Sequence, residues 1–116
     1  MGGTSEDRGK QGPGYNGYVT PELRELPSVW RAHQEARFPA SARREPFLPL
    51  DARIGAILTA CLKTDGIPRP LASEQRSALR RDRDALAAAL RSSSLDPQTI
   101  DYFSRLAWII DRVLSP

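Results

Sequence analysis

The chain has 116 residues with a formal net charge of +3, from 17 basic and 14 acidic side chains. This length allows one domain. A net charge this small argues against a nucleic-acid-binding protein, because such proteins usually concentrate positive charge on one face. No apolar run reaches the roughly 18 residues that a membrane span needs, and the first ten residues lack the apolar core of a signal peptide. The single cysteine, Cys61, excludes an internal disulfide, so we expect a cytoplasmic protein.

Apolar residues are concentrated after Leu48. Residues 1–19 are Gly-rich and polar and cannot bury enough surface to offset the entropy of ordering, so we predict a disordered N-terminal arm. Residues 20–50 are predicted to hold a short helix and an extended segment, and residues 51–116 a helical bundle domain. The strong preference for arginine over lysine is typical of a GC-rich bacterial or phage genome.

Proline positions divide the segment 20–38. Pro21 suits the first position of a helix, because the N–H that proline lacks would have no partner there. Pro27 is expected to end this first helical turn, which covers 21–26. A second short helix is expected over 28–38.

Residues 39–50, which we call the strap, are predicted to be extended. Pro46 and Pro49 hold the residues before them away from the helical region of backbone space. The strap is nevertheless too apolar for a plain linker, so it is expected to lie across the core through Phe47, Leu48 and Leu50.

Three longer helices are predicted over 52–64, 74–92 and 97–114, because apolar residues recur at helical spacing in each. The third begins with Asp96, a favourable N-cap, followed by Pro97. In the second, small residues flank a thin apolar stripe and would let a neighbouring helix approach closely; the stripe and its flanks are Leu79, Leu86 and Leu90 with Ala78, Ala85 and Ala89. No strand pattern competes, so the predicted fold class is all-α, a small helical bundle of three core helices with a short N-terminal helix and the strap.

The last helix has an apolar stripe that covers about half of its circumference. A stripe this wide needs more than one neighbour, so we expect this helix at the centre of the core. The stripe consists of Ile100, Tyr102, Phe103, Leu106, Ala107, Ile109, Ile110, Val113 and Leu114. Trp108 is the exception, because it falls on the opposite, charged face.

Trp108, Arg105 and Arg112 are the first candidates for a protein-binding surface, since Trp and Arg are enriched at binding hot spots. Two alternatives remain open at this point. Residues 21–50 could fold over the indole, or an arginine of the same helix could stack on it in a cation–π contact. The segment 27–50 supplies the other protein-binding candidates, Trp30, Phe47 and Leu48.

Signals of catalysis are weak. His33 is the only histidine, which excludes a His–His metal site within one chain. Cys61 lies within an apolar stripe, where cysteine usually behaves as a small hydrophobe. The Gly-rich arm has no Gly-Lys-Ser or Gly-Lys-Thr ending and is no phosphate loop. We therefore expect no metal, no cofactor and no enzymatic activity.

The leading hypothesis is a non-catalytic protein–protein interaction module, such as an adaptor, an inhibitor or a small subunit of a larger assembly. Its partner would be another protein, or a second copy in a homo-oligomer. The alternative is a nucleic-acid-binding protein that places Arg80, Arg81 and Arg83 on phosphates. Two aspartates interrupt this basic run, so ion pairing along a solvated helix face is the competing interpretation. No motif identifies a known family.

Overall fold

The computed structural model describes residues 21–92 and 94–115, so the arm predicted over 1–19 lies outside the described residues. The described residues form four α-helices and one 3-10 turn and contain no strand, which confirms the all-α fold class. In chain order the elements are α2 (Pro21–Glu35), η1 (Ala40–Ala42), α3 (Phe47–Leu62), α4 (Ser73–Ser92) and α5 (Pro97–Leu114).

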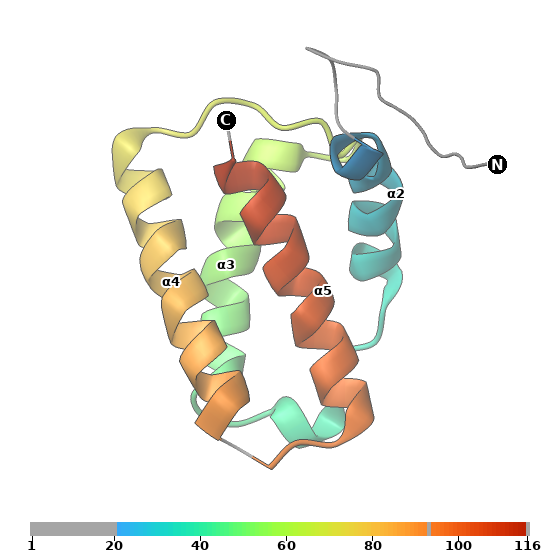
Figure 1. The fold of residues 1–116 in the computed structure, drawn as a ribbon, viewed down its shortest axis with the longest axis vertical. Helices are drawn as coiled ribbons and strands as arrows, with labels where there is room; N and C mark the ends of the chain where they lie inside the picture. Colours follow the sequence, from blue (N-terminus) through green and yellow to red (C-terminus); the bar gives the residue numbers. More distant parts are fainter. Residues whose placement is uncertain (1–20, 93, 116) are drawn as a thin grey trace, which may run out of the picture.

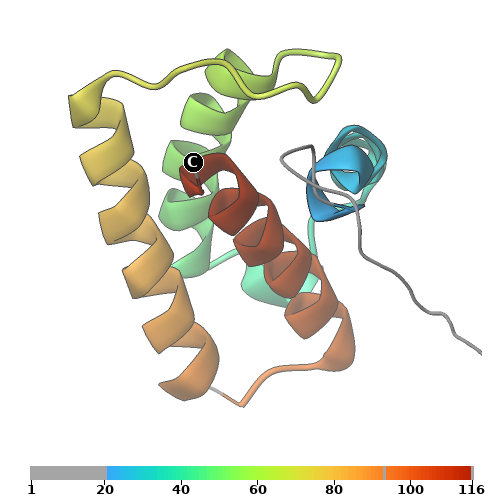
Figure 2. The same ribbon diagram turned by 45° about the horizontal axis from the view of Figure 1, so that its top comes forward.

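Successive helices run in opposite directions (Figure 1). Helix α5 lies in front of α3, with α4 on one side and α2 on the other, and the turned view keeps this order (Figure 2). Helix α5 contacts both α2 and α4, and α3 contacts α4. The central position predicted for the last helix is therefore what the described residues show.

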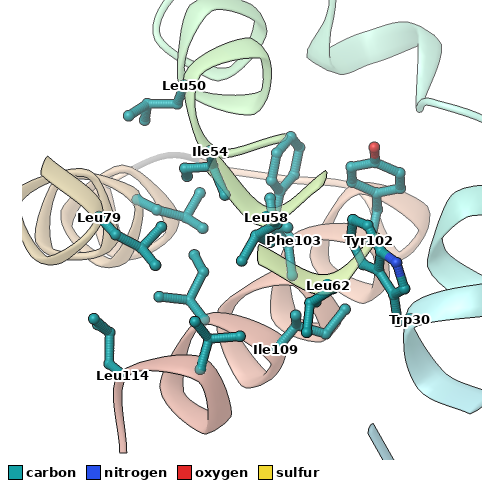
Figure 3. Close-up of a cluster of buried hydrophobic side chains, with 14 of the residues drawn as sticks. Trp30, Leu50, Ile54, Leu58, Leu62, Leu79, Tyr102, Phe103, Ile109 and Leu114 are labelled. Carbon is teal, nitrogen blue, oxygen red and sulfur yellow. The ribbon is translucent and has the colours of Figure 1, made fainter. Parts of the chain in front are cut away.

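The core lies between α5 and the three other helices (Figure 3). Its largest fully buried side chains come from every helix and include Leu26, Phe47, Ile54, Leu58, Leu62, Leu79, Leu86, Phe103, Leu106, Ile109 and Ile110. One member of the predicted stripe is outside it, because 44% of Ile100 is exposed. Thr99, which the sequence did not predict to be buried, is 1% exposed.

Hydrogen bonds explain why a threonine is buried at the start of α5. The Asp96 carboxylate accepts from the Thr99 backbone N–H at 3.3 Å and from the Thr99 hydroxyl at 2.7 Å, so the predicted N-cap is confirmed. The Ser41 hydroxyl of η1 also donates to this carboxylate. The bonds from Ser41 and then Thr99 lower the pKa of Asp96 to about 2. Helix α5 is thus capped and joined to η1 by the same three side chains.

Pro27 does not end the first helix, and this expectation was wrong. The predicted turn over 21–26 and most of the predicted helix over 28–38 form one helix, α2, with Pro27 inside it. Proline removes one backbone hydrogen bond there, but Leu26 and Trp30, four residues apart on one face, are 0% and 3% exposed. Tertiary packing of this face offsets the local cost of the proline.

The strap is also not extended throughout. Its last four residues form the first turn of α3, which begins at Phe47 instead of after Asp51. Pro49 fits there because the first N–H groups of a helix have no partner within it. Phe47 and Leu50 are buried as expected for a segment that packs on the core. Asp51 consequently lies inside the helix, and its carboxylate is free to bond elsewhere.

The end of α3 is positioned by a tight turn against α2. Helix α3 ends at Leu62, Gly66 follows with φ +72°, and its N–H donates to the Leu62 carbonyl at 2.9 Å. A Cβ on Gly66 would lie 2.6 Å from the Cα of Pro27. The indole N–H of Trp30 donates to the Lys63 carbonyl at 2.8 Å in the same region. Only glycine permits both the backbone conformation and this close approach.

Gly66→Ala is therefore expected to destabilise the fold by about 1–3 kcal/mol, because it adds both positive-φ strain and an overlap with Pro27. The matched control is Gly55→Ala. Gly55 lies inside α3 with nothing within 4 Å of its added Cβ, so this change is expected to stabilise by about 0.5–1 kcal/mol. Urea unfolding of both variants measures the difference, and equal effects in the two would contradict the role assigned to Gly66.

Candidate functional site

The outward face of α5 carries the first candidate site. Arg105, Trp108 and Arg112 follow one another at spacings of three and four residues, so they share one face of the helix. All three are partly buried, whereas Asp101 and Ser104 beside them are exposed. Helices α2 and α4 flank α5 and leave its front uncovered in the views of Figures 1 and 2. We call these five residues the Trp108 surface.

Trp108 is stacked by an arginine of its own helix. The guanidinium carbon of Arg112 lies 4.8 Å from the centre of the indole ring, which is a cation–π contact. The indole also packs against the edge of the hydrophobic core. Of the alternatives raised by the sequence, stacking by an arginine is the one observed, and it leaves Trp108 part-exposed.

Arg105 is directed toward a buried polar cluster between three helices. Its Nε donates to Nδ1 of His33 on α2 at 3.4 Å. The His33 ring lies 4.6 Å from the ring of Tyr102 on α5, and the Tyr102 hydroxyl donates to the Asp51 carboxylate of α3 at 3.1 Å. The four side chains thus join α2, α3 and α5 through two hydrogen bonds and one contact between rings.

Burial sets the protonation of this polar cluster. His33 is 7% exposed, and burial, with a smaller effect of the Arg105 charge, lowers its pKa to about 4. Burial also raises the pKa of Asp51, against the effect of the hydrogen bond from Tyr102. The pKa of Tyr102 is raised for the same reason, by burial first and by the nearby Asp51 charge second. At neutral pH His33 is therefore uncharged and accepts from Arg105.

Two of the sequence-based candidates are buried. Trp30 is 3% exposed and Phe47 is 0% exposed, so neither side chain is available at the surface. Leu48 is 49% exposed and lines a shallow hollow with Arg44, Glu45, Pro49 and Ala52. The structure does not bring Leu48 together with the Trp108 surface, because it lies in the first turn of α3 and Trp108 in the second half of α5.

The three arginines proposed for phosphate binding differ in their surroundings. Arg80 and Arg81 are exposed. Arg83 is part-buried and pairs with Asp84 at 3.4 Å and with Asp111 of α5 at 3.5 Å. Its guanidinium therefore links α4 to α5, as the ion-pairing interpretation of this run implies.

The sequence analysis missed Asp82 as a buried residue. Asp82 lies three residues after Leu79 and four before Leu86, within the apolar stripe of α4, and is 6% exposed. Arg53 of α3 donates to its Oδ1 at 3.4 Å. The helical spacing was the signal that could have found it, because a residue between two buried leucines on one stripe shares their face.

The lone cysteine is engaged away from His33. Cys61 is 2% exposed, and its thiol donates to the Arg69 carbonyl at 3.1 Å. Across the described ranges, no group of three or more His, Cys, Asp or Glu side chains is placed to hold a metal ion. None of the helices within those ranges has the length and apolar content to cross a membrane.

Comparison of the chain with protein-family models, with curated proteins and with solved structures gives no match.

The buried imidazole predicts a pH-dependent stability. The folded-state pKa of His33 is about 4, below the 6.5 that is usual for an exposed histidine, so the unfolded state binds the proton first as pH falls. Protonation of His33 is therefore expected to lower stability by about 1–3 kcal/mol between pH 6.5 and 4, and stability falls further below pH 4 as Asp96, whose pKa is about 2, is protonated. His33→Gln keeps an acceptor for Arg105 but cannot titrate. Denaturant unfolding at stepwise pH should give a flatter profile for this variant, and identical profiles would contradict the assignment.

Proposed function

We propose that this protein is a non-catalytic protein–protein interaction module that binds its partner through the Trp108 surface. The observation that carries the proposal is Trp108 itself, a part-exposed indole under the Arg112 guanidinium on a helix face that no other described element covers. Tryptophan and arginine are the residues most enriched at the energetic centres of protein interfaces. A partner that closes over this pair would remove the remaining indole surface from water and strengthen the cation–π contact by desolvation.

The surroundings of Trp108 suit such an anchor. Arg105 is held by its bond to His33, and Arg112 is held by its stacking on the indole, so both arginines lose less freedom on binding than free surface side chains would. Asp101 and Ser104 give the surface a polar rim. The preformed arrangement favours a binding role in an adaptor, an inhibitor or a small subunit of an assembly.

We propose a non-catalytic role because the two side chains best suited to catalysis, His33 and Cys61, are both buried. His33 is buried, uncharged at neutral pH and bonded to Arg105. Cys61 is buried and donates to a backbone carbonyl. Neither side chain is accessible to a substrate in this conformation.

Phosphate binding by α4 is the second candidate function. The exposure of Arg80 and Arg81 favours it, whereas the ion pairs of Arg83 with Asp84 and Asp111 oppose it. Binding of this kind would weaken steeply with salt, with a slope set by the number of phosphates contacted. Titration of the protein with duplex and single-stranded oligonucleotides at low salt tests it.

Trp108→Ala is expected to weaken binding of the natural partner by about 30-fold or more, which corresponds to the 2 kcal/mol of a hot-spot residue. Proteins captured from the source cells by the wild-type chain would be purified, and their direct affinities measured by calorimetry. The matched control is Ile67→Ala, which removes a side chain that is 58% exposed in the connection after α3.

Circular dichroism should show both variants folded, because neither change empties the core. A partner that binds the Trp108→Ala protein as tightly as the wild type would remove this surface from the proposal. Equal losses in the two variants would point to nonspecific apolar adhesion and would contradict it as well.

A further inference from the structure

A groove lies between α3 and α4. It encloses about 520 Å³, and residues of these two helices alone line it: Arg53, Ala56, Ile57, Ala78, Arg81, Asp82 and Ala85. It lies on the flank of α4 that is turned away from α5. The opposite flank of α4 meets α5 through Arg76, which donates to the Leu114 carbonyl, and through Arg83, which pairs with Asp111. The groove is thus separate from the Trp108 surface.

The shape of the groove fits an α-helix. On α4 the lining residues follow at i, i+3, i+4 and i+7, which spans two helical turns, or about 10 Å. Three of the lining side chains are alanines, Ala56 on α3 and Ala78 and Ala85 on α4. Small side chains at this spacing leave a hollow into which the side-chain ridge of a third helix can pack. The occupant is therefore expected to present an apolar ridge.

The charges of the groove specify an acidic partner. Arg53 on the α3 wall has a side chain 56% exposed, and Arg81 on the α4 wall is exposed. Arg81 forms no ion pair with any residue of the described ranges, in contrast to Arg53, Arg69 and Arg83. Arg81 can therefore pair with a carboxylate on one flank of an apolar ridge, and Arg53, which already donates to Asp82, keeps a side chain exposed enough to meet a second carboxylate on the other flank.

Asp82 adds a polar requirement at the floor of the groove. Its side chain is 8% exposed, and both hydrogen bonds from Arg53 end on Oδ1. No residue in the described part of the chain donates to Oδ2. A buried carboxylate oxygen without a donor is costly, so a partner with a hydroxyl or amide donor at this point would satisfy it.

We propose that the α3–α4 groove is a docking site for an acidic amphipathic helix of another protein. The apolar ridge of that helix packs over Ala78 and Ala85, its carboxylates pair with Arg53 and Arg81, and a hydroxyl or amide side chain donates to Asp82. This site is independent of the Trp108 surface, so each can fail without the other.

The test uses the full chain and a designed peptide. The peptide is a helix of about five turns with leucine and alanine on one ridge, glutamate on both flanks and a threonine at the ridge centre, labelled with fluorescein. A second peptide replaces every glutamate by glutamine. Fluorescence anisotropy is expected to show saturable binding of the acidic peptide, which salt weakens. The neutral peptide is expected to bind with an affinity lower by about tenfold or more.

Two pairs of variants locate the binding. Arg81→Gln is expected to weaken the acidic peptide about threefold to fivefold, as loss of one exposed ion pair implies, while Arg80→Gln, its exposed neighbour outside the groove lining, leaves affinity unchanged. Ala85→Met fills the groove and is expected to weaken binding about tenfold or more. Ala32→Met adds the same side chain at an exposed alanine of α2, which does not line the groove, and should have no effect.

Circular dichroism and thermal unfolding of each variant confirm that it is folded. Trp108→Ala should bind the peptide normally, which separates this site from the proposed partner surface on α5. Equal affinity for the two peptides, no binding of either, or equal effects within each pair of variants would overturn the proposal. So would sedimentation showing a dimer of the wild-type chain that Ala85→Met dissociates, because a second copy would then occupy the groove.

Discussion

The width of the apolar surface of α5 is the constraint from which the arrangement of the bundle follows. Buried positions extend from Tyr102 on the flank toward α2 to Leu114 on the flank toward α4, with Phe103, Leu106 and Ile110 between them. One neighbouring helix covers only a stripe, so three helices are needed to cover this surface. Helix α5 accordingly has α2 and α4 on its flanks and meets α3 through Phe103 against Phe47 and Tyr102 against Asp51 (Figure 1).

The same constraint leaves a narrow outward strip on α5, and Trp108 lies on it. Its position opposite the core could be predicted from the sequence, because 100° per residue places it there whatever the neighbours are. Its immediate surroundings could not. Which arginine stacks on the indole depends on side-chain rotamers and on competing partners, and Arg105 is taken by His33 on a distant segment, which leaves Arg112 for Trp108.

Proline marks the places where local reasoning failed. At Pro27 the lost hydrogen bond argued for a helix end, but burial of Leu26 and Trp30 on one face outweighs it. At Pro49 the residue before the proline was expected to leave the helical region, but Leu48 lies in the first turn of α3. The beginning and end of α5 were predicted correctly, since its cap and its termination depend on adjacent residues such as Asp96. Helix ends that depend on residues adjacent in the chain can be predicted from the sequence, whereas helix ends that depend on packing against distant segments cannot.

For the alanines of α4, the sequence predicted close approach of a helix but did not predict which alanines would stay open to solvent. Small residues beside a thin leucine stripe indicate that a helix can approach closely, and α3 is the neighbour in the structure. Yet Ala78 and Ala85 line an open groove, while only Ala89 is buried in the core. Side chains this small leave the groove open, and this is the space that the proposed partner helix would fill. Asp82 lies at the floor of this groove and is 6% exposed, so a hydrogen-bond donor on the proposed partner would offset part of the cost of burying its carboxylate. If the proposed helix binds there, it stabilises the folded state of this small bundle by mass action, so the melting temperature of the chain should rise with the concentration of the acidic peptide.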